Sequence, residues 1–193
     1  MLKVKLGQLS SLVLALLCVF STSVSAQTAS VTLSETSAQL GYGYLISGSD
    51  YGRTEIGVEF LYNSNDAYIV DTSLLVYDEV GSKLPGLVAG LGGKIYGAAF
   101  DSQEYLALGL GGIIRYAIPQ NNRIIIGLDG YYAPPIVSFF NAGRFYEWAA
   151  RVGYEILPKA SAYVEYRQFY VENDNGTGAP LEEGFRVGMK ITF

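Results

Sequence analysis

The chain has 193 residues, of which half are hydrophobic and only 16% are charged, with one Cys and no His. The absence of His excludes a Ser-His-Asp triad, a Cys-His dyad and any imidazole metal ligand. One domain is the default at this length, and no apolar run after residue 26 approaches the length of a membrane-spanning helix.

The first 26 residues have the three parts of a secretory signal peptide. Two Lys residues form a basic start, Leu9 to Phe20 is apolar, and small residues lead to Ala26. Cleavage after Ala26 predicts a single mature domain of residues 27–193. The only Cys, Cys18, lies in the signal, so the sequence excludes disulfides, thiolate catalysis and Cys metal sites in the mature protein.

The charge of the mature protein is negative. Removing the two signal lysines from 13 basic residues leaves 11 against 18 acidic ones, a net charge of −7. This balance argues against nucleic acid or anionic lipid headgroups as partners. The Gly-rich stretches 90–93 and 109–112 lie inside predicted strands without a following helix, so they do not form phosphate loops, and we expect no cofactor.

From residue 30 onward the sequence alternates apolar and polar positions with period two, which predicts strands. A short alternation covers Ser30 to Ser34, and the first clear segment runs from Ala38 to Ile46. In the segment from Tyr146 to Ile156 one face is wholly apolar and the other carries charge at three of five positions. The eight clear segments after the first are 55–62, 68–76, 87–95, 106–116, 124–132, 146–156, 162–167 and 185–193.

Segments of about ten residues with one apolar face are typical of transmembrane β-strands. Closure is obligatory, because an open sheet edge in lipid leaves backbone groups without hydrogen bonds. We therefore predict an all-β fold, an antiparallel transmembrane β-barrel. Such barrels have an even number of strands, so Ser30 to Ser34 supplies the tenth strand, with eight strands as the alternative. A soluble barrel or sandwich with its apolar face inward is the other candidate.

The polar faces carry seven acidic and seven basic residues, a balance suited to a narrow lumen crossed by ion pairs. We expect Arg151 to pair along its own strand with Glu147 or Glu155, and such pairing disfavours a catalytic acid. The charges that would line an ion path through the lumen are Lys94, Arg115, Glu147, Arg151, Glu155, Glu165 and Arg167.

The connections alternate in length. Residues 117–122 and 157–159 read as short turns with Pro, and 133–144 and 172–183 read as longer loops. Short turns of bacterial barrels face the periplasm and long loops face outside. With a periplasmic C-terminus, the long connection 78–85 falls on the periplasmic side, where a short turn is usual.

Two groups of side chains lie near these connections. Acidic residues between Glu172 and Glu183 predict a solvated loop rather than a Ca²⁺ site, because they lack the ligand spacing of a known loop. Aromatic residues near strand ends predict a girdle at the membrane boundary, with a sugar-stacking platform as the alternative: Tyr131, Tyr132, Phe139, Phe140, Tyr146, Trp148, Tyr166 and Tyr170.

The chain ends on Phe193, with Ile191, Met189 and Val187 at alternate positions before it. This pattern is typical of the C-terminal signal read by the outer-membrane barrel assembly machinery. We expect that machinery, periplasmic chaperones and the outer-membrane bilayer as partners, and the sequence identifies no external partner.

The order of several motifs resembles the YfaZ-type family of bacterial outer-membrane proteins. The resemblance is carried by the signal segment, Leu40–Tyr44, Leu91–Tyr96, Tyr131–Pro134, Val152–Pro158 and the terminal strand to Phe193. It implies a barrel in the cell outer membrane and brings no defined activity and no functional residues.

These observations predict an outer-membrane protein with a structural, interaction or narrow-channel role that is not an enzyme. A soluble periplasmic carrier of an apolar ligand is one alternative. A lipid-modifying or proteolytic barrel enzyme is a second, disfavoured by the absence of His.

Overall fold

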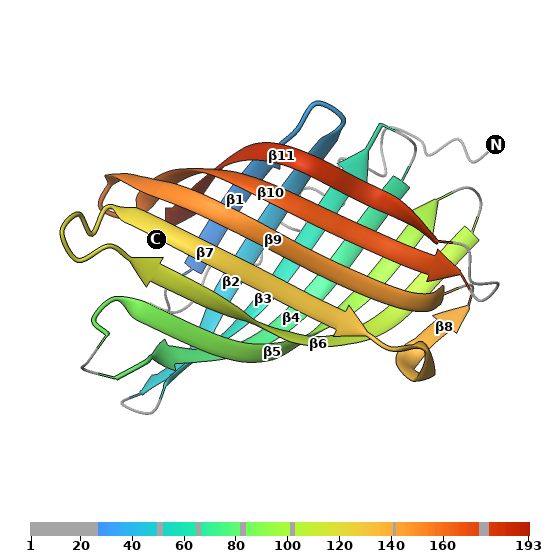
Figure 1. Cartoon of the computed structure of the whole chain (residues 1–193), viewed down its shortest axis with the longest axis horizontal. Coiled ribbons are helices and arrows are strands. Elements are labelled where there is room, and N and C mark those ends of the chain that lie inside the picture. The colour runs from blue at the N-terminus through green and yellow to red at the C-terminus, as the bar shows by residue number, and fades with distance from the viewer. Residues whose placement is uncertain are drawn as a thin grey trace.

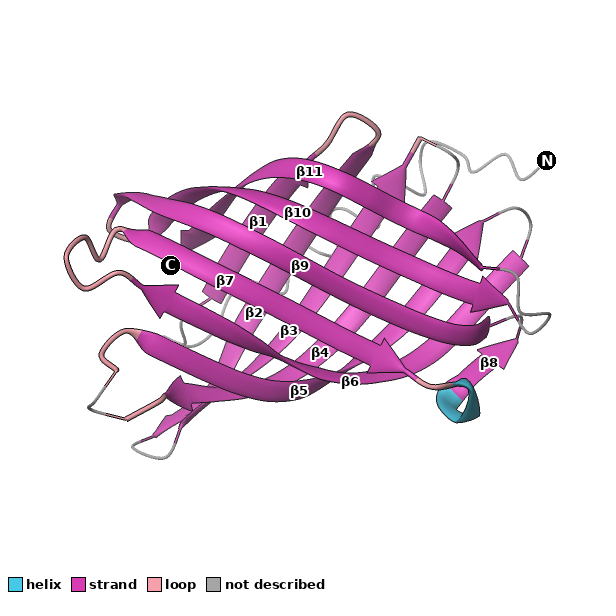
Figure 2. Cartoon of the chain, in the orientation of Figure 1, coloured by secondary structure: helices cyan, strands magenta, loops and turns pink. Residues whose placement is uncertain are grey.

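The computed structural model describes residues 27–49, 52–64, 67–81, 84–100, 103–140, 142–173 and 178–193, and the predicted signal peptide lies outside them. The described residues form one antiparallel sheet that closes into a ten-stranded barrel (Figures 1 and 2). Its strands are β1 (Gln27–Leu33), β2 (Ser37–Ser49), β3 (Gly52–Asn63), β4 (Ala67–Glu79), β5 (Leu87–Phe100), β6 (Gln103–Ala117), β7 (Ile124–Ala133), β9 (Ala142–Leu157), β10 (Ala160–Asn173) and β11 (Gly178–Thr192).

Two pairings complete the barrel. Strands β5 and β6 pair from Leu87 with Tyr116 to Phe100 with Gln103, which joins the two edges of the sheet. Strand β1 bridges β11 and β2, so the weak alternation of residues 30–34 does belong to a strand. The predicted count of ten strands is therefore confirmed, and the alternative of eight is wrong.

The two ends of the barrel differ. At one end, here called the terminal end, Gln27 and Phe193 exchange two backbone hydrogen bonds of 3.0 and 2.9 Å. The short turn before β10 also lies there, with Lys159 at φ 84°. The opposite end, here called the loop end, holds the connection from β7 to β9. That connection contains a 3-10 turn, η2 (Pro135–Val137), and a three-residue strand, β8 (Ser138–Phe140), that pairs with β6 (Figure 1).

Among the described residues, no helix is long and apolar enough to span a bilayer. The connection after β4 lies at the terminal end, as the alternating strand directions require.

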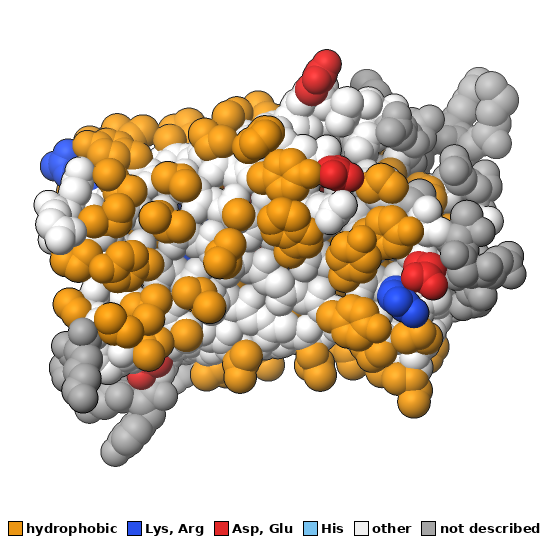
Figure 3. Space-filling model, in the orientation of Figure 1, with side chains coloured by type: hydrophobic (Ala, Val, Ile, Leu, Met, Phe, Trp, Pro, Cys, Tyr) orange, Lys and Arg blue, Asp and Glu red, His pale blue; other side chains and the backbone are white. Residues whose placement is uncertain are grey.

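The apolar face of each strand points outward. Figure 3 shows hydrophobic side chains spread along the barrel wall. Leu91 is 78% exposed, and Leu110 and Phe185 are exposed to a similar degree. A soluble barrel would need the reverse arrangement, with this face turned inward, so that alternative is wrong.

Candidate functional site

The inward-facing side chains form three successive layers along the barrel axis. An apolar plug lies at the loop end, an ionic belt lies below it, and a cavity lined by both charged and apolar residues lies at the terminal end. Each layer takes side chains from the same relative height of several strands, because alternate residues of every strand point inward.

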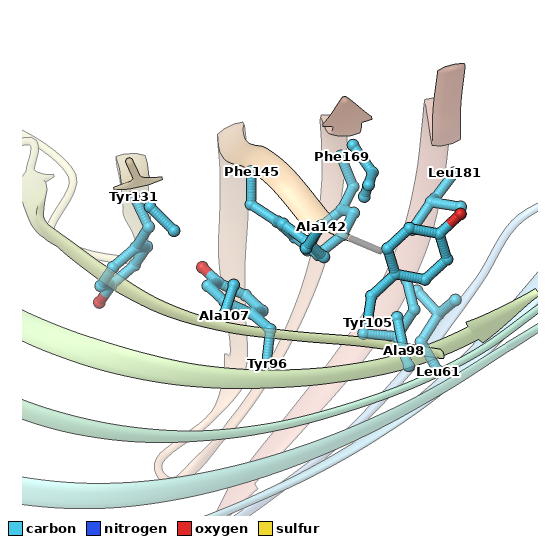
Figure 4. Packing of buried hydrophobic residues seen from close by; sticks show 13 residues of the cluster. Leu61, Tyr96, Ala98, Tyr105, Ala107, Tyr131, Ala142, Phe145, Phe169 and Leu181 are labelled. Atoms are coloured by element: carbon cyan, nitrogen blue, oxygen red, sulfur yellow. The ribbon is translucent and has the colours of Figure 1, made fainter. Parts of the chain in front are cut away.

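The plug contains thirteen buried residues (Figure 4). Tyr96 and Phe145 are 1% exposed and Phe169 is 0% exposed, so water reaches these rings from neither end of the barrel. In an open pore, inward-facing side chains of this height would contact lumen water. The plug comprises Leu61, Ile69, Tyr96, Ala98, Tyr105, Ala107, Tyr131, Ala133, Ala142, Phe145, Phe169, Val171 and Leu181.

Three rings form the centre of the plug. The ring centroids of Tyr96 and Phe145 lie 5.9 Å apart, those of Tyr96 and Phe169 lie 5.4 Å apart, and those of Phe145 and Phe169 lie 5.7 Å apart. Two of these pairs are edge-to-face, a favoured arrangement for aromatic rings. Tyr105 extends the cluster by an edge contact with Phe145 at 6.3 Å.

Tyr131 belongs to the plug, so its prediction as a girdle residue is wrong. It follows Gly130 and precedes Tyr132 on β7, and only one of two adjacent residues can face outward. Tyr132 takes the outer face and is exposed. On the same outer surface, Tyr146 stacks on Tyr170 at 4.9 Å.

The ionic belt begins directly below the plug at Lys94. Its Nζ lies 3.3 Å from an oxygen of Glu147 and 3.6 Å from oxygens of both Glu59 and Asp71. The ammonium group also lies 4.9 Å from the ring centroid of Tyr131. Strands β3, β4, β5 and β9 thus meet at one buried cation.

Two arginines continue the belt around the barrel. Arg167 lies 2.7 Å from Glu147, and Arg186 pairs with Glu165 and, at 3.1 Å, with Glu182. Both guanidinium groups donate to Oε1 of Gln39, at 2.6 and 2.7 Å. Charges removed from water need such partners, because an unpaired buried ion is strongly destabilising.

Apart from Arg186 and Glu182, which both lie on β11, the ion pairs of the barrel interior run across strands. Arg151 binds Glu165 of β10 at 2.6 Å and approaches Asp129 of β7 at 3.9 Å, whereas the expected partners were Glu147 and Glu155 on its own strand. Residues four apart on a strand are separated by roughly 13 Å, while residues on paired strands are about 5 Å apart. The expectation that Arg151 pairs along its own strand was therefore wrong.

Glu182 also departs from prediction. The sequence placed it in a solvated loop, but β11 begins at Gly178 and turns Glu182 into the barrel, where it is 5% exposed. It accepts a hydrogen bond from Ser37 and pairs with Arg186. The described residues of the predicted loop 172–183 therefore belong to strands β10 and β11. Within β11, Glu182 supplies a carboxylate to the ionic belt.

A cavity of about 260 Å³ opens below the belt. Arg115, Lys190, Arg151 and Lys159 contribute basic groups to its lining, and Tyr163 contributes a ring. A second space of about 110 Å³ joins it at the belt. The lining residues that both spaces share are Arg115, Asp129, Arg151, Tyr163 and Lys190.

Tyr163 divides the belt from the cavity. Its hydroxyl lies 2.6 Å from Oγ1 of Thr32, and the guanidinium carbon of Arg151 lies 4.5 Å from its ring centroid. The ring covers Gly188 on β11, where an added Cβ would overlap ring atoms of Tyr163. The glycine therefore makes room for the ring.

All seven charges predicted for the lumen face the interior, but they lie in different layers. Lys94, Glu147, Glu165 and Arg167 belong to the belt; Arg115 and Glu155 line the cavity, and Arg151 lies at the boundary. Prediction from sequence missed the plug entirely. The sequence feature that could have indicated the plug is the loss of apolar–polar alternation near the loop end. There, adjacent residues such as Phe145 and Tyr146 make both faces of the strand apolar.

Among the described residues, no group of three or more His, Cys, Asp or Glu side chains is arranged to hold a metal ion. Lys94 occupies the point where three carboxylates of the belt converge.

Three solved structures match the chain with TM-scores below 0.5 and sequence identities of 10–12%. The chain is similar to a structure from a study named "Unveiling the Mechanism Behind the in-meso Crystallization of Membrane Proteins" (TM-score 0.45, 11% identity, covering 88% of this chain and 83% of that one). It is similar to KdgM porin (TM-score 0.46, 12% identity, 87% and 99% covered). It is equally similar to KdgM porin in complex with disordered oligogalacturonate (TM-score 0.46, 10% identity, 87% and 99% covered).

No curated protein matches the chain. The sequence model of the YfaZ precursor family, however, matches residues 1–193, the whole chain. The protein belongs to the YfaZ family.

Proposed function

We propose that this protein is an outer-membrane barrel whose lumen is closed at the loop end, with a structural or interaction role rather than that of an open pore. The observation that carries the proposal is the plug. Tyr96, Phe145 and Phe169 fill the barrel and exclude water from their rings. A barrel of this strand number has an interior that side chains can largely fill.

The outer face supports the membrane location. Large apolar side chains such as Leu91, Leu110 and Phe185 are exposed along the wall. Contiguous apolar surfaces of this extent are rare on soluble monomers. A bilayer that covers this surface, with the terminal end in the periplasm, leaves the belt and cavity shielded from lipid. We propose no catalytic activity, and delivery to the membrane by the barrel assembly machinery.

Planar-bilayer conductance tests the closed lumen. The protein is refolded, and heat-modifiable gel migration shows that the barrel has formed. We expect no discrete current steps from the wild type, and steps from Phe145→Ala and Phe169→Ala, because each removes a ring from the centre of the plug. Phe185→Ala on the outer face is the matched control and should stay silent.

Discrete steps from the wild type would overturn the proposal and favour a narrow channel. In that case Arg115→Gln and Arg151→Gln should change the ion selectivity, since both side chains line the spaces below the belt.

A further inference from the structure

The basic groups of the terminal cavity differ in their partners. Arg151 is held by Glu165 and approached by Asp129. Within the described part of the chain, Arg115, Lys159 and Lys190 have no carboxylate oxygen within 4.0 Å. The cavity therefore presents positive charge that its own walls leave unpaired.

Three carboxylates lie near enough to be considered as partners: Asp129, Glu155 and Glu55. Asp129 lines both spaces and lies 3.9 Å from Arg151. Glu155 lines the cavity from β9 and makes no ion pair with the described residues. Glu55 lines the smaller space, where it accepts a hydrogen bond of 3.3 Å from Tyr77. Four basic residues line the larger cavity against two acidic residues, Asp129 and Glu155, so its lining carries an excess of positive charge.

The cavity is blind and partly apolar. Lys159, Ala160 and Thr192 lie at its rim, at the terminal end of the barrel, while the belt and plug close the other side. Its wall includes Ile125 and the ring of Tyr163. Its volume is about 260 Å³.

We propose that this cavity binds a small amphiphilic anion, a carboxylate or phosphate monoester with a short apolar group, that enters from the terminal end. Arg115 and Lys190 bind the anionic head, because both line the cavity with unpaired charge, and Ile125 and Tyr163 contact the apolar group. Charge-assisted hydrogen bonds to such a head are among the stronger polar interactions. Binding does not depend on whether the barrel conducts.

Isothermal titration calorimetry of the full barrel, refolded in zwitterionic micelles, tests the proposal. The probes are hexyl phosphate, hexanoate and the neutral hexanol. We expect saturable binding of one anion per barrel and none of hexanol. Binding of hexyl phosphate alone would assign a phosphate head, and binding of hexanoate alone would assign a carboxylate head.

Four variants locate the site. Arg115→Gln and Lys190→Gln should each raise the Kd at least tenfold. Gly153→Leu should do the same without altering any charge, because Gly153 lines the cavity and a Cβ there has no neighbour nearer than 3.6 Å. Arg144→Gln is the matched control at the loop end, where Arg144 pairs with Glu172, and should bind like the wild type.

Heat-modifiable migration is measured for each variant, and Gly153→Leu serves if a charge variant does not fold. The proposal is overturned if no anion binds saturably, if hexanol binds as well as the anions, or if the folded variants Arg115→Gln, Lys190→Gln and Gly153→Leu bind like the wild type.

Discussion

Replacing Lys94 with Met is expected to destabilise the barrel far more than replacing Lys190, a lumen lysine outside the ionic belt. The Nζ of Lys94 lies within 3.6 Å of oxygens of Glu59, Asp71 and Glu147. A pair at this distance is worth about 5 kcal/mol at an effective dielectric constant of about 20, much of which offsets desolvation. Removing one partner of a buried ion pair typically costs about 3–5 kcal/mol.

Urea unfolding in phospholipid vesicles measures this loss. Fluorescence of Trp148, the only Trp of the chain, reports the transition from the outer face of the barrel. We expect Lys94→Met to lower the free energy of unfolding by about 3–5 kcal/mol, which is roughly two to three and a half orders of magnitude in the equilibrium constant.

Lys190→Met is the matched control. Lys190 also faces the interior, but it has no carboxylate oxygen within 4.0 Å among the described residues, so its loss should cost under about 1 kcal/mol. Asp71 has Lys94 as its only ion-pair partner in the described part of the chain. Asp71→Asn should therefore restore part of the stability lost in Lys94→Met. Equal losses in the two lysine variants would refute the reasoning.

Two further predictions concern packing and assembly. Gly188→Leu should lower the free energy of unfolding by about 1–3 kcal/mol, because its Cβ would overlap the Tyr163 ring. The control Gly130→Ala has open space at its Cβ and should stay within about 0.5 kcal/mol of the wild type; equal losses in the two variants would contradict this. Phe193→Ala keeps the backbone hydrogen bonds to Gln27 and should lower the assembled fraction in outer membranes, measured by heat-modifiable migration, without preventing refolding in vitro. An unchanged assembled fraction would argue against the assembly signal.

The outer surface was readable from the sequence because it obeys one rule along every strand. Lipid-facing positions such as Val58 and Phe60 must be apolar at every second residue, and β1 needed only Val31 and Leu33 to continue the pattern. Even the weakest segment therefore joined the barrel.

The side-chain contacts of the interior were harder to predict from the sequence, because they depend on the register between neighbouring strands. Arg151 meets Glu165 because β9 and β10 pair those two positions directly, and the spacing within one strand carries no such information. The plug escaped prediction for a related reason. Inward rings such as Phe145 beside outward rings such as Tyr146 erase the alternation that marks a one-sided strand.

Lys94 and Lys190 show that the position of a lumen charge along the barrel axis determines whether the fold supplies its partner or leaves it available to a ligand. Both lie on inward faces, but Lys94 borders the dry plug and is surrounded by three carboxylates. The side chain of Lys94 is only 9% exposed, so its charge depends on the carboxylates that the fold supplies. Lys190 and Arg115 border a cavity that opens at the terminal end, where water or a ligand can take the place of a fixed carboxylate. Charge that the fold leaves unpaired thus lies where a ligand from the terminal end can reach it.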